Sequence, residues 1–142
     1  MTPEIPFGHK IEGTPPSAEH VNKVLHDYCA ALSAGDLDGI INLFDENAQF
    51  FDPVGEEARH GHDEIREFFA ASAGMLELRV EGAVRVAGFY AAAAMRARVH
   101  GFGPDIFFVD TLDALAFNEA GKITQFYAFW GPTNNPSPDT SW

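Results

Sequence analysis

Acid–base chemistry is the first possibility that this sequence offers, and Asp52 is the residue that suggests it. Asp52 follows the apolar run Ala48–Phe51 and precedes Pro53, which holds the aspartate in extended backbone. The carboxylate is therefore presented at a fixed corner among apolar side chains. A base that moves a proton between two atoms of one substrate needs such an anchor. The ordinary alternative is an aspartate that caps its own turn, since Asp-Pro is common in turns.

A second carboxyl group, Asp113, falls on a predicted strand over Ile106–Phe117. Along this strand it shares one face with Val109, Thr111, Leu115 and Phe117. A charge on an apolar interior face is costly, so the acid would keep its proton and act as a hydrogen-bond donor. The alternative is that this face meets solvent and that Asp113 is an ordinary surface carboxylate.

Tyr28 is the third polar candidate, because it lies on the apolar stripe of a predicted helix that ends near Ala34, before Gly35. The stripe has helical spacing and comprises Val21, Val24, Leu25, Tyr28 and Leu32. A buried tyrosine hydroxyl needs a partner. That partner is either a backbone carbonyl in the core or a group inside a cavity.

The elements that must position these residues change type halfway along the chain. Thr14–Ser17 has the capping and proline pattern of a helix start, Asp36 can cap a short second helix, and His62–Ser72 shows helical spacing. From Met75 the apolar period becomes two, which predicts successive strands up to Trp130. Helices followed by antiparallel strands predict an α+β fold, with a curved sheet and helices on one side.

Composition bounds the possible partners. The chain has 142 residues, 46% of them hydrophobic, and a net charge of −12. This length fits one domain, which we place at residues 14–131, with an N-terminal arm (1–13) and a loose C-terminal tail (132–142). The acidic balance argues against a nucleic acid or an acidic membrane surface and favours a neutral or apolar ligand.

Further classes of site and location are disfavoured by what the sequence contains. A single cysteine, Cys29, excludes an internal disulfide and a cysteine metal site. His60 and His62 do not have the spacing of a helical metal pair, so we expect no metal. No apolar run reaches the ~18 residues of a membrane span, and the start lacks the order of a signal peptide. We therefore expect a cytoplasmic protein.

Several stretches of the chain resemble the Δ5-3-ketosteroid isomerase family, within the nuclear-transport-factor-2-like superfamily. They are Tyr28–Ile40, Asp52–Gly55, Ile65–Phe69, Leu112–Lys122 and Ala128–Trp130. The resemblance implies a cone-like fold of this superfamily, with a curved, mostly antiparallel sheet and three helices packed on one face around an apolar pocket. It also implies an enzyme that needs no cofactor and acts on a small apolar steroid-like substrate. Separately, the strands around Phe107 and Phe126 carry apolar residues on both faces, so we expect a homodimer built through the sheet face that the helices do not cover.

The resemblance also implies roles for individual residues. Asp52 matches the base, and Tyr28 and Asp113 match the pair that stabilises the oxyanion, with Asp113 protonated at neutral pH as this family keeps it. Trp130 matches a tryptophan that lines the steroid pocket. Phe69 and Phe126 are the further substrate-binding candidates.

One departure from the family concerns the surroundings of Tyr28. Phe44 and Phe69 stand where some members have tyrosines that hydrogen-bond to the oxyanion tyrosine. Tyr28 would then lack these donors, which leaves the reaction class intact and puts its rate in question.

Two other functions stay open at this point. A SnoaL-like cyclase or epoxide hydrolase on the same fold would want an Asp-Arg-Asp set that holds a water molecule. Arg96 and Arg98 are candidates for the arginine, but they alternate along a strand on the face that we expect to meet water. A non-catalytic binding or dimerisation module would not need three polar groups on interior faces.

Overall fold

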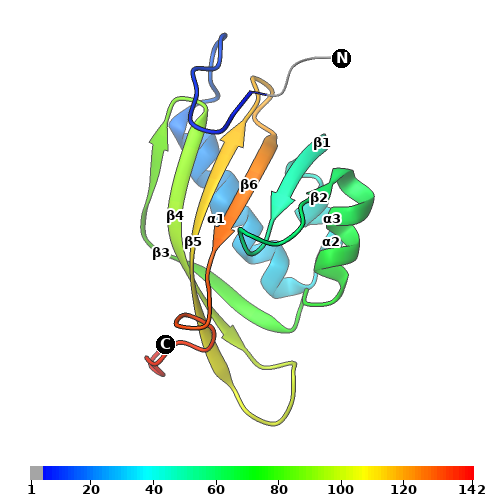
Figure 1. The fold of residues 1–142 in the computed structure, drawn as a ribbon, viewed down its shortest axis with the longest axis vertical. Coiled ribbons are helices and arrows are strands. Elements are labelled where there is room, and N and C mark those ends of the chain that lie inside the picture. Colours follow the sequence, from blue (N-terminus) through cyan, green and yellow to red (C-terminus); the bar gives the residue numbers. More distant parts are fainter. Residues whose placement is uncertain (1–4) are drawn as a thin grey trace.

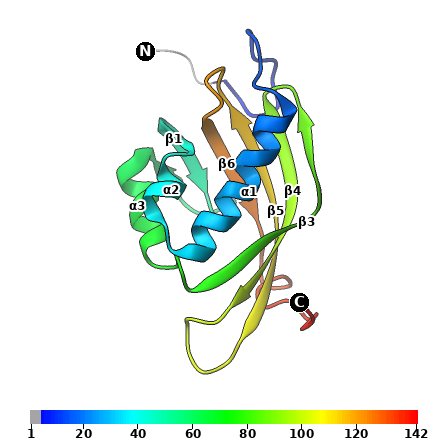
Figure 2. The same ribbon diagram turned by 180° about the vertical axis from the view of Figure 1, so that it is seen from behind.

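One curved, open sheet of six strands carries three helices on one of its faces (Figure 1), and α1 crosses that face in the reverse view (Figure 2). The computed structural model describes residues 5–142. The strands lie in the order β2-β1-β6-β5-β4-β3; all neighbours are antiparallel except β1 and β6, which run parallel. This is the α+β architecture expected from the sequence.

The helices are α1 (Ala18–Ala34), α2 (Leu37–Ile41) and α3 (Gly61–Ala70). The strands are β1 (Phe44–Phe51), β2 (Arg59–His60), β3 (Leu76–Ala87), β4 (Tyr90–Val99), β5 (Phe107–Phe117) and β6 (Ile123–Phe129). The two-residue strand β2 is too short to show any periodicity in the sequence. Its pairing with β1, through Phe50↔Arg59, depends on a partner elsewhere in the chain.

The first helix forms as its apolar spacing predicts. Ser17 caps it by accepting a hydrogen bond from the His20 backbone N–H at 3.1 Å. The helix ends at Gly35, whose φ of 75° lies in the left-handed region that glycine adopts without a steric penalty. The predicted stripe is buried, and Tyr28 lies on it with 3% of its surface exposed.

The two ends of the chain are more ordered than the sequence suggests. The described part of the N-terminal arm, residues 5–13, packs on the sheet through Phe7, whose ring lies 4.9 Å from Tyr90 and 4.8 Å from Tyr127 between centroids. Met1–Glu4 lie outside the described residues. The C-terminal segment 132–142 is not loose, because Arg96 anchors it by donating to the carbonyl groups of Asp139 and Ser141.

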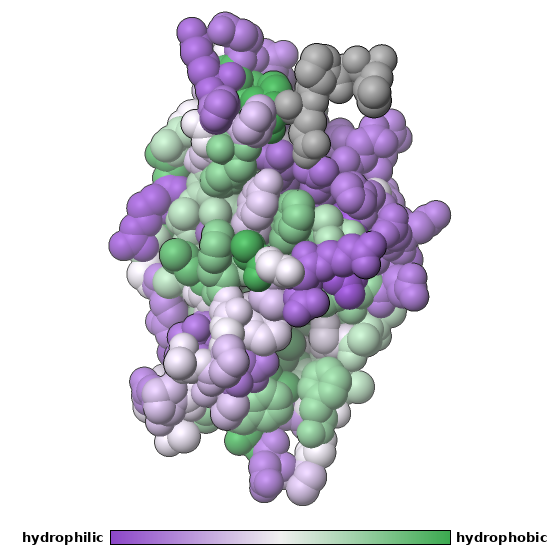
Figure 3. All heavy atoms as spheres, viewed as in Figure 1, coloured by the Kyte–Doolittle hydropathy of each residue, from purple (hydrophilic) through white to green (hydrophobic). Residues whose placement is uncertain are grey.

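The core lies between α1, α2, α3 and the inner face of the sheet, where a cluster of apolar side chains is almost completely buried. On the opposite, outer face, apolar residues gather over the central strands (Figure 3). Leu112 and Phe129 pair across β5 and β6 on that face and are 51% and 48% exposed. Within residues 5–142, no helix is long and apolar enough to cross a membrane.

Candidate active site

A cavity of about 340 Å³ lies between α1, α3 and the inner face of the sheet. This volume falls in the range of small-molecule sites, about 300–1,000 Å³. Most of its wall is apolar, with leucine, valine and phenylalanine side chains from α1, α3, β3, β4 and β5. Its polar or partly polar lining residues are Tyr28, Asp52, Ser72, Thr111, Asp113, Trp130 and Asn135.

Asp52 reaches the cavity from the corner that follows β1. The Trp130 indole Nε1 donates a hydrogen bond to Asp52 Oδ1 at 2.6 Å. Burial raises the pKa of the Asp52 carboxyl to about 6, although the Trp130 hydrogen bond and the positive charge of Arg59 act to lower it. The carboxyl group is therefore mostly ionised at neutral pH and has a pKa suited to accepting and returning a proton.

Asp113 lies on the interior face of β5, as the strand phase predicts, and is 3% exposed. Burial and the nearby charge of Asp52 raise its pKa well above the ordinary value, and a hydrogen bond with Thr111 only partly opposes this shift. Its Oδ1 atom is buried and has no hydrogen-bond partner among residues 5–142. A protonated carboxyl group in this position can donate a hydrogen bond to a ligand in the cavity.

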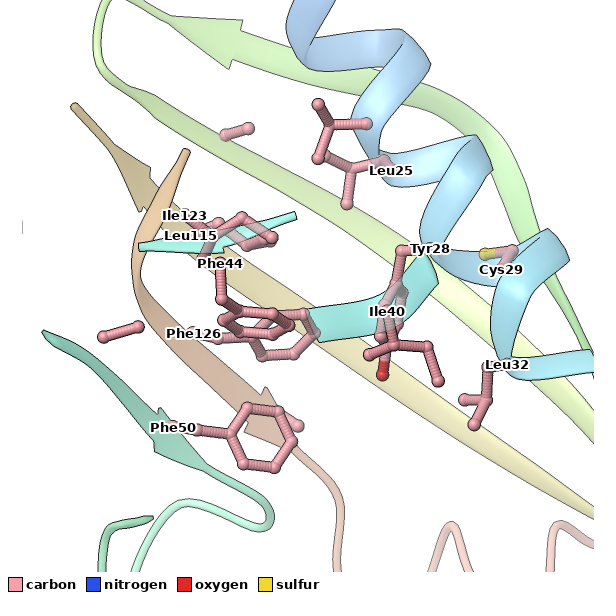
Figure 4. Packing of buried hydrophobic residues seen from close by; sticks show 14 of the residues in the cluster. Leu25, Tyr28, Cys29, Leu32, Ile40, Phe44, Phe50, Leu115, Ile123 and Phe126 are labelled. Carbon is pink, nitrogen blue, oxygen red and sulfur yellow. The ribbon is translucent and has the colours of Figure 1, made fainter. Parts of the chain in front are cut away.

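Tyr28 enters the same cavity from α1, with its hydroxyl at the end of the ring remote from the helix (Figure 4). Burial raises the pKa of the phenol well above its usual value, with further contributions from Asp113 and Asp52. The hydroxyl therefore stays protonated and available as a donor. Among the described residues the hydroxyl has no side-chain partner, and the Tyr28 ring packs edge-on against Phe69, at 5.9 Å between centroids.

Strand register explains why the two aspartates meet in one cavity. Phe51 pairs with Tyr127 across β1 and β6, and Ala128, the next residue, pairs with Asp113 on β5. Asp52 follows Phe51, so the two aspartates are two strand spacings apart, about 10 Å, with Ala128 between them. On the other side Asp113 pairs with Ala93 of β4. Of these two neighbours only Ala128 lines the cavity, and its small side chain leaves space for a ligand beside Asp113.

The two carboxyl groups have different pKa values because their surroundings differ. Asp52 has a donor in Trp130 and a nearby cation in Arg59, whereas Asp113 is fully surrounded by protein and faces the negative charge of Asp52. Two carboxyl groups whose pKa values differ in this way supply one base and one neutral donor at the same pH. Together with the Tyr28 hydroxyl, the arrangement offers two donors and one base to a bound molecule.

The three substrate-binding candidates occupy different places. Phe69 and Trp130 line the cavity. Phe126 is completely buried and is not on the cavity wall; its ring supports that of Tyr28 from behind, at 5.2 Å between centroids. Phe44 is also in this aromatic layer, stacked on Phe126 at 6.1 Å between centroids, so phenyl rings without hydroxyl groups lie beside and behind Tyr28.

Sequence patterns did not indicate several features of the cavity. The Trp130–Asp52 hydrogen bond joins residues 78 positions apart. Asn135 belongs to the C-terminal segment, and Phe102 to the turn after β4, yet both line the cavity. The alternation along β5 could have drawn attention to Thr111, which shares the inner face with Asp113, but no local pattern points to Asn135.

The arginines that a hydrolase-type site would need lie elsewhere. Arg96 is bound to Asp110 at 2.6 Å and is only 4% exposed, because the C-terminal segment covers it; the expectation that its surface faces water is therefore wrong. Arg98 pairs with Glu77 at 2.7 Å. Within residues 5–142, no arginine lines the cavity.

A second hollow and the other polar groups of the described residues are less suited to catalysis or metal binding. A larger hollow of about 720 Å³ is found near the described arm, and its polar groups include Asp45, Asn118 and Gln125. Asn118 donates to Asp45, and Gln125 donates to the Ile5 carbonyl oxygen, so these side chains already have partners. No group of three or more potential metal-ligating side chains occurs in the described part of the chain.

Comparisons with known proteins show which sequences and structures this chain resembles. A family model described as "SnoaL-like domain" matches residues 25–126. The steroid Delta-isomerase of Nocardioides simplex is 33% identical over 116 residues, which cover 82% of this chain and 93% of that protein. The solved structure of SalBIII, an epoxide hydrolase/cyclase-like enzyme in pyran ring formation in polyether salinomycin, matches with a TM-score of 0.75 and 26% identity. That match covers 82% of this chain and 94% of SalBIII.

Proposed function

The chain belongs to the SnoaL-like domain family, and from this premise we propose that it is a steroid Δ-isomerase. The proposed reaction moves a carbon–carbon double bond of a 3-oxo steroid from the Δ5 to the Δ4 position. The observation that carries the proposal is the buried, unpartnered Oδ1 of Asp113, which lines the same cavity as Tyr28 and Asp52. A ligand oxygen placed there would give this group the partner that it lacks within residues 5–142.

The proposed mechanism assigns one role to each polar group. The substrate ketone accepts hydrogen bonds from the Tyr28 hydroxyl and from the protonated Asp113 carboxyl. Ionised Asp52 removes a proton from the carbon between the ketone and the double bond, and the electron pair moves towards the ketone oxygen to form a dienolate. The two donors stabilise the negative charge where it develops. Asp52 then returns the proton two carbons further along, which yields the conjugated enone.

The surroundings of the site favour this shuttle. The Trp130 hydrogen bond holds the Asp52 carboxyl in place while one of its oxygens can exchange the proton. The apolar wall keeps water away, which strengthens the hydrogen bonds to the dienolate and limits loss of the proton to solvent. One carboxyl group can serve both carbons because the proton travels only a short distance.

A direct assay tests the proposal. Adding 5-androstene-3,17-dione to the purified protein should produce the ultraviolet band of a conjugated enone, and the rate should be proportional to enzyme concentration. The Asp52→Asn variant serves as the matched control. Binding of the steroid without any new band would instead indicate a non-catalytic binding module.

The cyclase or epoxide hydrolase alternative has some support from the similarity to SalBIII. Against it, the lining residues described here include no arginine to hold a water molecule beside the aspartates. Hydrolysis of an epoxide without isomerisation of the steroid would favour this alternative.

A further inference from the structure

The segment that follows β6 continues along the edge of β5 after β6 has ended. The last residue of β6, Phe129, pairs with Leu112. Beyond it, the Asp110 N–H donates to the Asn134 carbonyl at 3.1 Å, and the Ser137 N–H donates to the Phe108 carbonyl at 2.6 Å. Residues 134–137 therefore lie beside the first half of β5, and Asn135 is adjacent to Val109.

Buried charge holds this segment in place from the outer face of the sheet. Arg96 Nη1 donates to Asp110 Oδ1 at 2.6 Å, and Nη2 donates to the Asp139 carbonyl at 2.7 Å. The guanidinium group also lies over the Phe108 ring, 4.7 Å from its centroid. Because a buried arginine without these partners would be costly, the segment has one firm position, and Asn135 has a defined place on the cavity wall.

Asn135 lies further along the cavity wall, away from the oxyanion donors. Val109 precedes Asp113 by four residues on β5, a distance of about 13 Å along a strand. Both residues line the cavity, as does Asn135. The wall between them is mainly apolar, and Thr111 lies midway along it. Among the described residues, no side chain pairs with the Asn135 carboxamide, which can both donate and accept.

We infer that Asn135 binds a polar group at the far end of the substrate. A ligand whose ketone lies between Tyr28 and Asp113 and whose body follows β5 would place its other end beside Asn135. The preferred substrate class is therefore an elongated, fused-ring ketone with a second oxygen at the opposite end, as in a 3,17-dioxo steroid. This inference rests on the proposed function only for the placement of the ketone between Tyr28 and Asp113. Asn135 lies beyond residues 25–126, the stretch that the family model matches.

The test compares two substrates that differ only at the far end: 5-androstene-3,17-dione and 5-androsten-3-one, which lacks the second oxygen. Asn135→Leu removes the hydrogen-bonding group at nearly constant volume. It should raise KM for the dione by about fivefold, the size of one neutral hydrogen bond. KM for the monoketone should not rise, and kcat should change little for either substrate. Asn134→Leu is the matched control, because the neighbouring asparagine does not line the cavity.

Two kinetic results would overturn the inference. Equal increases in KM for both substrates would show that Asn135 only supports the wall, and an unchanged KM for the dione would show no contact. If the wild-type protein turns over neither steroid, the proposed function fails, but this inference can still be tested by calorimetric binding. Asn135→Leu should then weaken binding of the dione selectively, and equal affinities of wild type and variant for the dione would reject it.

Discussion

Trp130 and Asp52 are joined by a 2.6 Å hydrogen bond from the indole Nε1 to the carboxylate Oδ1. The bond links the residue after β6 to the residue after β1, the one pair of neighbouring strands in the described sheet that run parallel. It stabilises the ionised form of a carboxyl group that burial would otherwise keep protonated, and so acts against the rise in its pKa.

This relationship predicts the pH dependence of the reaction. Because Asp52 must be ionised to accept a proton, kcat/KM should rise with pH through about 6 and then level off. Trp130→Phe removes the hydrogen bond, so the pKa of Asp52 should increase and the rise should move to higher pH. We expect a shift of about one unit, since a hydrogen bond to a charged group contributes about 1.5–3 kcal/mol, part of it lost to solvent screening.

The control for this measurement is Trp142→Phe, which makes the same chemical change at a tryptophan that lies over Arg79 and Arg98 instead. Its profile should match that of the wild type. A Trp130→Phe profile with an unchanged midpoint would mean that the indole does not influence the base.

Asp52→Asn should remove turnover while keeping or strengthening the binding of a phenolic, equilenin-like steroid. Without the base, kcat should fall by about 10²–10⁴-fold. Loss of the negative charge also removes repulsion towards a bound oxyanion. Steady-state kinetics and fluorescence titration measure the two effects, with Glu46→Gln, an exposed carboxylate on the same strand, as control. Near-normal activity of Asp52→Asn would place the base at another residue.

The oxyanion pair is tested by comparing an acid, an amide and an alkyl group at position 113. Tyr28→Phe and Asp113→Leu should each lower kcat by about 10²–10³-fold and affect KM less, because these hydrogen bonds strengthen as charge develops. Asp113→Asn keeps a donor and should be milder. The double variant should be slower than either single variant, although not by the product, since both donors share one acceptor. Near wild-type rates for both Asp113 variants would remove it from the mechanism.

Asp113 should also make the stability of the protein depend on pH. Its pKa is raised in the folded state, so the folded protein binds more protons than the unfolded chain above the unfolded pKa of about 3.9, and stability falls as the pH rises from there. Asp113→Asn has no carboxyl group at this position, so its stability does not fall with rising pH for this reason. The free energy of unfolding of the variant minus that of the wild type, measured by urea denaturation, should therefore increase progressively from about pH 4 upward. A pH-independent difference would contradict a raised pKa at this residue.

We further propose that the protein is a homodimer that uses the outer face of the sheet. Leu112 and Phe129 are about half exposed there, and an exposed apolar surface of this kind is typical of a protein–protein interface. Analytical ultracentrifugation at micromolar concentration should show a dimer, and Leu112→Lys should shift it towards monomer. Met75→Lys, at a 40% exposed residue in the turn before β3, should leave it unchanged. A wild-type protein that sediments only as monomer would reject the proposal.

The sequence alone determined the features that depend on near neighbours. The buried stripe of α1 that carries Tyr28 follows from a spacing of three and four residues, and the inward direction of Asp113 follows from alternation along β5. The corner at Asp52 follows from the adjoining proline. These patterns indicate which face of a helix or strand is buried, and they depend only on residues within that element.

Only the tertiary structure decided which of these residues meet. The parallel pairing of β1 with β6 brings Asp52 within reach of Trp130 and places Ala128 between the two aspartates. It also assigns Phe126 to the support of Tyr28, although alternation could not distinguish a cavity wall from the core behind it. Segment 132–142 has no apolar period, so its polar residues gave no sign that a buried Arg96 would bind them and carry Asn135 to the cavity. Contacts of this kind join residues far apart in the chain, and their free energy exists only once the sheet has formed.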